Sequence, residues 1–316
     1  MHTSPFFKLF PPPKFLIMKH AGLDISDDAI RCIQYTPSSR GLAVEKHGAV
    51  ELPDGLVDGG DVKDEKAFAE ILKKFDDTYD LSYVKVSVPE EKAYLFETEV
   101  PKADVHAIGQ NIEFKLEENV PLSAPDAVFY FDLMPGRAAG GSLRASVSVV
   151  PRTYIEKRLA LLRQVGMSPI AFEIAPKSIA RAVVPPGNSE TWLIVHIMDR
   201  KTGLYVVSGG IVLFTSTVGW GVRAGVADEA AATLSREIGR VHSYWVSRAS
   251  ATIGRIMLVG RGALACERLV REAISGVPVG VAEVWRNALN LDRYIPPISR
   301  DDSLDYAVAA GLAMGS

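Results

Sequence analysis

The first third of the chain alternates hydrophobic and polar residues and then repeats apolar residues at helical spacing, which predicts a mixed α/β order. Three strands separated by Asp-, Ser- and Pro-rich turns are expected at the start: 19–26, 29–35 and 42–52. A helix is expected at 64–75 and a strand at 83–88. The helix has four apolar residues on one face: Phe68, Ile71, Leu72 and Phe75.

The middle of the chain is predicted to be an inserted α+β subdomain, residues 92–150. It has three expected strands: 93–100, 127–133 and 143–150. An amphipathic helix lies between the first two, with apolar residues spaced for one face: Val105, Ile108, Ile112 and Leu116. The glycine-rich loop 134–141 is expected to be the most flexible stretch.

The rest of the chain repeats the opening order after a linker at 185–189. Before the linker we expect a helix, a strand and a helix: 152–164, 170–173 and 174–183. After it come strands at 191–198, 203–208 and 211–218, a helix at 228–247, a strand at 255–259, a helix at 263–274, a strand at 277–281 and a closing helix at about 302–312. Each half is therefore predicted to be βββαβα.

These patterns divide the chain into four parts. They are a flexible N-terminal tail at 1–19, a first lobe made of 20–91 and 151–184, the inserted subdomain at 92–150 and a second lobe at 190–316. The tail lacks the long apolar region and cleavage site of a signal peptide. It is expected to be a simple tail, with an aromatic anchor for a membrane surface or a partner as the alternative.

Composition limits the classes of function. Of the 316 residues 47% are hydrophobic and 23% are charged, which indicates a globular protein. The formal net charge of −3 gives no electrostatic reason to bind nucleic acid. The two cysteines, Cys32 and Cys266, are expected to be buried thiols and not a disulfide. No apolar stretch approaches the ~20 residues that cross a bilayer.

A duplicated three-strand opening is typical of an actin-like fold, in which two hairpins hold nucleotide phosphates. Each hairpin needs a glycine, so that backbone N–H groups approach phosphate oxygens, and an acidic residue that orients Mg²⁺ through water. A third glycine-rich turn faces the adenosine. The candidate positions for nucleotide contact are Asp24, Ser26, Thr202, Gly260 and Gly262.

From about residue 20 to 314 the chain resembles the type IV pilus assembly protein PilM family, which is actin-like and cytoplasmic. The resemblance rests on the order of Gly22-Leu23-Asp24-Ile25, segment 51–59, Val86-Ser87-Val88-Pro89, Glu99-Val100-Pro101, Asn119-Val120-Pro121-Leu122, segment 162–169, Leu258-Val259-Gly260-Arg261-Gly262 and Ala310-Gly311-Leu312-Ala313. It implies an α/β, actin-like (ribonuclease H-like) fold with duplicated βββαβα lobes and an inserted α+β subdomain.

The phosphate motifs depart from the family pattern. Ser26 stands where the family has glycine, and His196-Ile197-Met198 replaces its Asp-Ile-Gly. Two lost contacts of about 1.5–3 kcal/mol each imply at least a hundredfold weaker binding of ATP and Mg²⁺. The hypothesis is a degenerate, non-enzymatic site in which Met198 fills the phosphate position. Structural alternatives stay open: Asp24 as a turn residue, His196 as a core histidine and Gly260-Arg261-Gly262 as a plain strand-to-helix turn.

The resemblance also implies partners. PilM-type proteins lie at the cytoplasmic face of the inner membrane, bind the N-terminal peptide of the bitopic protein PilN and communicate with the pilus motor ATPases. The candidate groove residues in the inserted subdomain are Val100, Pro101, Ile112, Leu116, Pro121, Phe129 and Phe131. The alternative is that these residues only form the core of the subdomain. Self-association stays open.

Three functions compete at this point. The first is a docking protein of a type IV pilus or a related secretion machine. The second is an active actin-like ATPase, as in cell-division relatives. The third is the cytoplasmic domain of a type II secretion platform protein, which usually continues into a transmembrane helix.

Overall fold

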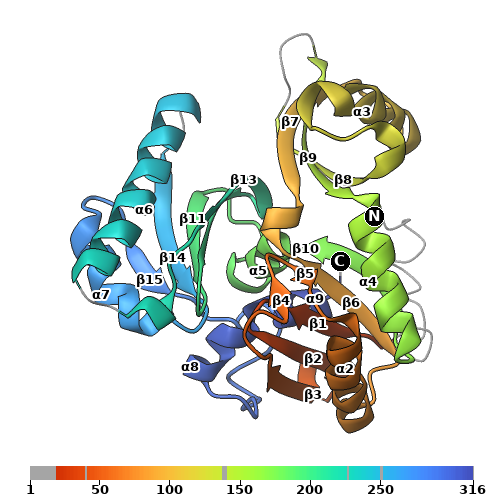
Figure 1. The fold of residues 1–316 in the computed structure, drawn as a ribbon. Helices are drawn as coiled ribbons and strands as arrows, with labels where there is room; N and C mark the ends of the chain where they lie inside the picture. The colour runs from red at the N-terminus through yellow and green to blue at the C-terminus, as the bar shows by residue number, and fades with distance from the viewer. Residues whose placement is uncertain (1–18, 40, 137–140, 226–227, 250–251, 316) are drawn as a thin grey trace.

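The computed structural model describes residues 19–39, 41–136, 141–225, 228–249 and 252–315. Most of the predicted tail and the centre of the predicted flexible loop lie outside these residues. In Figure 1 one large sheet lies at the lower right, the inserted unit stands above it and the second large sheet lies at the left. Helices α5 (Ala175–Val183) and α9 (Ala307–Ala313) lie between the two large sheets.

The first sheet has the strand order β10-β6-β1-β2-β3. Its strands are β1 (Ala21–Ile25), β2 (Ala29–Ser38), β3 (Gly41–Glu51), β6 (Tyr83–Val88) and β10 (Ser168–Ile174). β1 pairs antiparallel with β2 and parallel with β6, which in turn pairs parallel with β10. Helices α2 (Glu65–Tyr79) and α4 (Arg152–Gln164) contribute to the core over this sheet, which is built around residues such as Phe68, Leu72 and Leu162.

The start of α2 shows how the sequence sets a boundary. The side chain of Asp64 accepts a hydrogen bond from the backbone N–H of Ala67 and caps the helix. Between β3 and α2 lies a short hairpin that the pattern did not predict, β4 (Val57–Asp58) and β5 (Asp61–Val62). After β6 the 3-10 turn η2 (Glu90–Lys92) leads into the inserted unit.

The inserted unit is a three-stranded sheet of order β7-β9-β8 with one helix packed on it. Its elements are β7 (Tyr94–Val100), α3 (Val105–Asn119), η3 (Ala124–Asp126), β8 (Ala127–Leu133) and β9 (Leu143–Pro151). Ile108, Ile112 and Leu116 of α3 are buried as predicted, whereas Val105 is 68% exposed. Val105 lies at the first position of the helix, directly after the capping residue Asp104.

The second large sheet has the strand order β13-β12-β11-β14-β15. Its strands are β11 (Thr191–Ile197), β12 (Thr202–Ser208), β13 (Ile211–Val218), β14 (Ile253–Val259) and β15 (Val279–Val281). Helices α6 (Asp228–Ala249) and α7 (Ala263–Ala273) pack on this sheet, and η5 (Val222–Ala224) follows β13. Both halves thus have the predicted antiparallel three-strand opening with a parallel strand beside it.

The predicted closing helix is interrupted. It consists of α8 (Arg300–Ser303), the 3-10 turn η6 (Leu304–Tyr306) and α9. The hydroxyl of Ser303 donates a hydrogen bond to the carbonyl of Arg300, a local contact that competes with regular helix geometry. α9 then packs against both α5 and β1.

That packing explains two glycines in the motifs. A Cβ on Gly22 would lie 2.0 Å from the carbonyl oxygen of Ala309, and one on Gly311 would lie 1.8 Å from that of Ser178. Backbone therefore meets backbone where β1, α5 and α9 converge. The four-part division of the chain stays a prediction.

Candidate functional site

The site predicted from the sequence lies where the β1–β2 and β11–β12 hairpins meet. In the first hairpin the hydroxyl of Ser26 donates to the carbonyl of Ala29 at 3.0 Å and accepts from the Ala29 N–H at 3.1 Å. The Ser26 side chain therefore closes the turn on itself. These contacts use Ser26 within its own hairpin.

Asp24 is buried in β1, opposite Arg31 of β2. Burial raises the pKa of Asp24 above its usual value, and Arg31, the Ser87 hydroxyl and Lys201 partly offset this effect. The guanidinium of Arg31 also lies 3.5 Å from the carboxylate of Asp305, just before α9. Asp24 thus belongs to a buried charged network.

Lys201 crosses from the second hairpin to the first. Its ammonium lies 2.8 Å from the carboxylate of Asp27 and also pairs with Glu91 of η2. Asp27 accepts a further hydrogen bond from the backbone N–H of Gly60 at 2.9 Å. Burial opposes ionisation of Asp27, but Lys201 and the backbone N–H groups outweigh it, so the pKa of Asp27 is lowered. The pKa of Lys201 is raised, because its acidic neighbours outweigh burial.

Arginines of the second half reach carboxylates of the first half at two further points. Arg223 pairs with Asp54 at 2.7 Å, and Arg200 also contacts Asp54. Arg261, in the turn between β14 and α7, contacts Glu51 of the first half at 2.7 Å and also Asp305 of its own half at 3.0 Å. The two hairpin regions are therefore joined directly by ion pairs.

A buried polar cluster lies behind these pairs. His196 of β11 has its Nδ1 3.5 Å from the hydroxyl of Tyr205, and Thr217 donates to the buried carboxyl of Glu90 at 3.3 Å. Burial lowers the pKa of His196 to about 3, and the positive charges of Arg31 and Lys201 act in the same direction. At neutral pH the ring is a neutral part of the interior, in agreement with the structural alternative for this residue.

The buried position of His196 predicts a loss of stability as the pH falls. Because the pKa of His196 is lower in the folded protein than its value of 6.5 when unfolded, the unfolded chain binds a proton first as the pH falls. Because the residue as a whole keeps partial solvent exposure, we expect His196 to reduce the free energy of unfolding by about 1–2 kcal/mol between pH 6.5 and 4.5. Urea unfolding of wild type and His196→Gln at both pH values measures the difference. If the free energy of unfolding falls by the same amount between the two pH values in both proteins, His196 makes no such contribution.

The other three candidate residues make internal contacts. The buried hydroxyl of Thr202 donates to the carbonyl of Trp220 at 2.9 Å. The backbone N–H of Gly260 donates to Leu304, and that of Gly262 donates to Ile197, both at 3.2 Å. A Cβ on Gly260 would lie 2.4 Å from the carbonyl oxygen of Ile197. Both glycines are thus required for close packing of the β14–α7 turn on the end of β11.

The structure brings the two hairpins and the β14–α7 turn together, as predicted. The hairpins are joined by the ion pairs Lys201–Asp27 and Arg200–Asp28. The role of Met198 as a filler of the phosphate position stays a prediction. The sequence analysis did not predict the ion pairs of Lys201, Asp27, Glu91 and Arg261. Three of these four follow a candidate motif by a few residues, and their charges of opposite sign were the available signal.

The predicted groove residues fall into two groups. Val100, Ile112 and Leu116 are at most 1% exposed and form the core of the inserted unit, against which Phe129 and Phe131 pack. Val100, Ile112 and Leu116 therefore lie where the core alternative places them, whereas Phe129 and Phe131 are partly exposed and their role in a groove stays a prediction. The two exposed members are Pro101 and Pro121.

The opposite face of β8 and the free side of β10 expose other apolar residues. Val128 is 37% exposed, Tyr130 58% and Ile170 42%, and Ile170 lies at a bulge in β10. Lys177 of α5 pairs with Asp132 of β8 at 2.7 Å and lies 3.7 Å above the Tyr130 ring. We call these five residues the β8–β10 face: Val128, Tyr130 and Asp132 share one face of β8, Lys177 contacts the last two, and Ile170 lies on β10. The period-two alternation of residues along β8 was the signal that Val128 and Tyr130 share one face of the strand.

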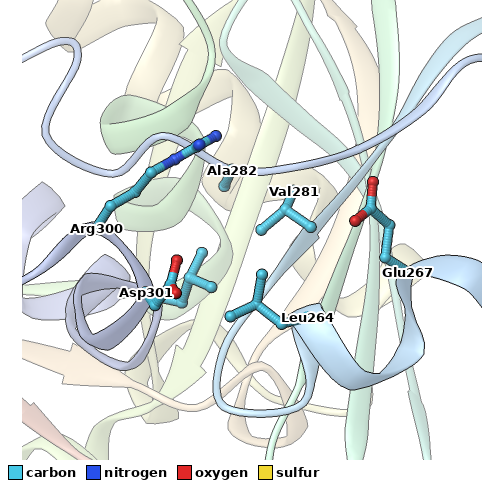
Figure 2. A pocket seen from close by; sticks show the side chains of 7 residues that line it. Leu264, Glu267, Val281, Ala282, Arg300 and Asp301 are labelled. Carbon is cyan, nitrogen blue, oxygen red and sulfur yellow. The ribbon is translucent and has the colours of Figure 1, made fainter.

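A cavity of about 260 Å³ lies elsewhere, between α7, β15 and α8. Figure 2 shows Arg300 and Asp301 on one side of it and Glu267 on the other, around Leu264 and Val281. It contains none of the predicted site residues. In the described part of the chain, no cluster of three or more His, Cys, Asp or Glu side chains is arranged to hold a metal ion.

Comparison with solved structures shows an actin-like fold. The chain is similar to a structure described as the PilM-PilN type IV pilus biogenesis complex, with a TM-score of 0.78 and 18% identity over 94% of this chain and 98% of that one.

Two further similarities are weaker. The ethanolamine utilization protein EutJ from Carboxydothermus hydrogenoformans gives a TM-score of 0.52 at 13% identity, over 96% of this chain and 90% of that one. The cytoplasmic domain of EpsL, an inner-membrane component of the type II secretion system of Vibrio cholerae, gives 0.50 at 15% identity, over 92% and 94%. No protein-family model matches the sequence, and no curated protein matches it significantly. No helix among the described residues is long and apolar enough to cross a membrane.

Proposed function

We propose that this protein is an actin-like assembly component of a type IV pilus or a related secretion machine, which docks a membrane partner and does not turn over ATP. The likeness to PilM over nearly the whole chain supports the system. The observation that carries the non-enzymatic part is the ion pair between Lys201 and Asp27. It joins the two hairpins where an actin-like protein holds triphosphate.

The residues present do not fit a bound nucleotide. The N–H groups of Gly260 and Gly262 already donate to backbone carbonyls, and the Ser26 hydroxyl is used within its own turn. The position of the second Mg²⁺-side carboxylate is held by His196, whose pKa is lowered to about 3. A phosphate that entered would have to break the Lys201–Asp27 pair and lie beside carboxylates, at a high electrostatic cost.

Docking of the partner is assigned to the β8–β10 face. β8 and β10 are each the last strand of their sheet, so each has a side without a strand partner among the described residues. An extended peptide gains backbone hydrogen bonds from such an edge and specificity from neighbouring side chains. Val128, Tyr130 and Ile170 supply apolar contacts, and Lys177 with Asp132 supplies charge. The occupant proposed is the cytoplasmic N-terminal peptide of a PilN-like inner-membrane protein.

The proposal extends to location and further contacts. Binding to such a partner would hold the protein at the cytoplasmic face of the inner membrane, and the pilus motor ATPases are the second class of partner. Self-association stays open. None of these contacts requires nucleic acid.

Peptide titration tests the docking. A synthetic N-terminal peptide of the PilN-like protein from the same organism should bind with micromolar affinity in isothermal calorimetry, and a scrambled peptide of the same composition should not. Equal binding of both peptides, or of neither, would contradict the docking assignment.

Nucleotide titration tests the other half of the proposal. Mg-ATP at 1 mM, a concentration on the order of cellular ATP, is expected to leave the melting midpoint unchanged within error, because ligand-induced stabilisation vanishes when the dissociation constant far exceeds the ligand concentration. The measurement is differential scanning fluorimetry with and without Mg²⁺, and the partner peptide serves as the positive control. A Mg²⁺-dependent rise of several degrees would support the alternative function, an active ATPase.

A further inference from the structure

Lys201 contacts more than the opposite hairpin. Its side chain is 12% exposed, and its ammonium pairs with Asp27 of the β1–β2 turn and with Glu91 of η2. Lys201 itself belongs to the β11–β12 turn. One largely buried cation therefore joins the first sheet, the second sheet and the segment that leads into the inserted unit.

The segment η2 is held on both sides of Glu91. Glu90 is buried and accepts a hydrogen bond from Thr217 of β13 at 3.3 Å. Lys92 pairs with Asp61 of β5 at 2.7 Å. β7 begins two residues after this turn, so the orientation of η2 sets where the inserted sheet starts.

The inserted sheet has a second attachment to the β13 side. The buried hydroxyl of Ser146 in β9 donates to the carbonyl of Val212 in β13 at 2.7 Å. The second half of the chain thus holds the inserted unit at two points, η2 and Ser146. At η2, the ion pair with the second half is made by Lys201.

We propose that Lys201 is a positioning residue that fixes the inserted unit and the two large sheets relative to one another without a bound nucleotide. In this role Lys201 supplies the least exposed of the second half's positive charges that pair with the first half, beside the more exposed Arg200, Arg223 and Arg261. When Lys201 is removed, Asp27 and Glu91 lose their shared cation, and Asp24 and Glu90 lose a favourable electrostatic neighbour. The resulting repulsion among these carboxylates favours separation of the two large sheets and the inserted unit.

The consequence for docking rests on the proposed function. The β8–β10 face is built from one strand of the inserted unit and one strand of the first sheet. The geometry of this face therefore depends on the orientation of the inserted unit relative to the first sheet. Loss of Lys201 is expected to weaken peptide binding about tenfold although Lys201 is not part of this face.

Spin-label distances test the proposal directly. Nitroxides are attached to Phe114→Cys on α3 and Arg268→Cys on α7, two sites whose native side chains are 85% and 89% exposed. The native thiols Cys32 and Cys266 are fully buried, so they should not react. Double electron–electron resonance is then recorded in the Lys201 background, in Lys201→Met and in Lys201→Arg.

The expected result is a narrow distribution for Lys201, a similar one for Lys201→Arg and at least a twofold broader one for Lys201→Met. Glu91→Gln removes one ion pair and leaves the Lys201–Asp27 pair in place, so it should give a distribution of intermediate width. This milder variant is expected to remain folded, and it tests the proposal even if Lys201→Met unfolds. An unchanged distribution in Glu91→Gln and in a folded Lys201→Met would overturn the proposal. If the peptide fails to bind wild type, the docking function fails, but the distance measurement still decides the role of Lys201.

Discussion

Replacing Gly311 by alanine is expected to lower the free energy of unfolding by about 3–5 kcal/mol. A Cβ at this position would lie 1.8 Å from the carbonyl oxygen of Ser178 in α5. Because the obstacle is backbone within a helix, no side-chain rotation relieves the overlap. The carbonyl of Gly311 also accepts a hydrogen bond from Arg181 at 2.9 Å, so a shift of α9 would disturb that contact as well.

The matched control is Gly109→Ala in α3. An added methyl group at Gly109 meets nothing within 4 Å, and the residue lies inside a helix. We expect a gain of about 0.5–1 kcal/mol from helix propensity. Urea unfolding followed by circular dichroism measures both variants. If Gly311→Ala were as stable as wild type, the close approach of α5 and α9 would not be a feature of the native protein.

Replacing Ile170 by aspartate is expected to weaken binding of the partner peptide at least a hundredfold, with little change in folding. Ile170 is 42% exposed at the bulge of β10, so its substitution leaves the core intact. In the complex the new carboxylate would be buried against an apolar peptide without a partner charge, which is strongly unfavourable. Calorimetry with the peptide measures the loss, and the melting midpoint reports on folding.

Ile295→Asp is the control for this variant. Ile295 is 90% exposed and lies in the loop before α8, away from the β8–β10 face. The same chemical change there should leave peptide affinity unchanged. Peptide binding that survives Ile170→Asp, or falls equally in both variants, would exclude β10 as the docking edge.

Much of the fold was predictable from local pattern. Strand 83–88, strand 127–133 and helix 152–164 agree with the structure at both ends. Each has a clear signal at its boundaries, such as Pro89 after the first of them. The hairpin β4–β5 and the division of the closing helix were missed, because two-residue strands and a 3-10 turn leave too short a pattern to detect.

The predicted docking residues show a different limit. Phe129 and Phe131 were assigned to a groove because they are apolar and lie in the right unit; the structure shows both as partly buried and packed against the core of that unit. Alternation along a strand states that neighbours face opposite sides, and it does not state which side the helix covers. Only the position of α3 on the sheet decides that Tyr130 is the exposed aromatic residue.

The sequence by itself determined the duplicated order of elements and the inserted unit, because each is written in local spacing and residue type. The tertiary structure decided which charged residues join the two hairpins. Asp27, Glu91 and Lys201 are separated by 64 to 174 positions, so no local pattern pairs them. Their attraction operates only once the two sheets have folded and brought the charges within a few ångströms in a poorly hydrated place, where Coulomb interactions are strong.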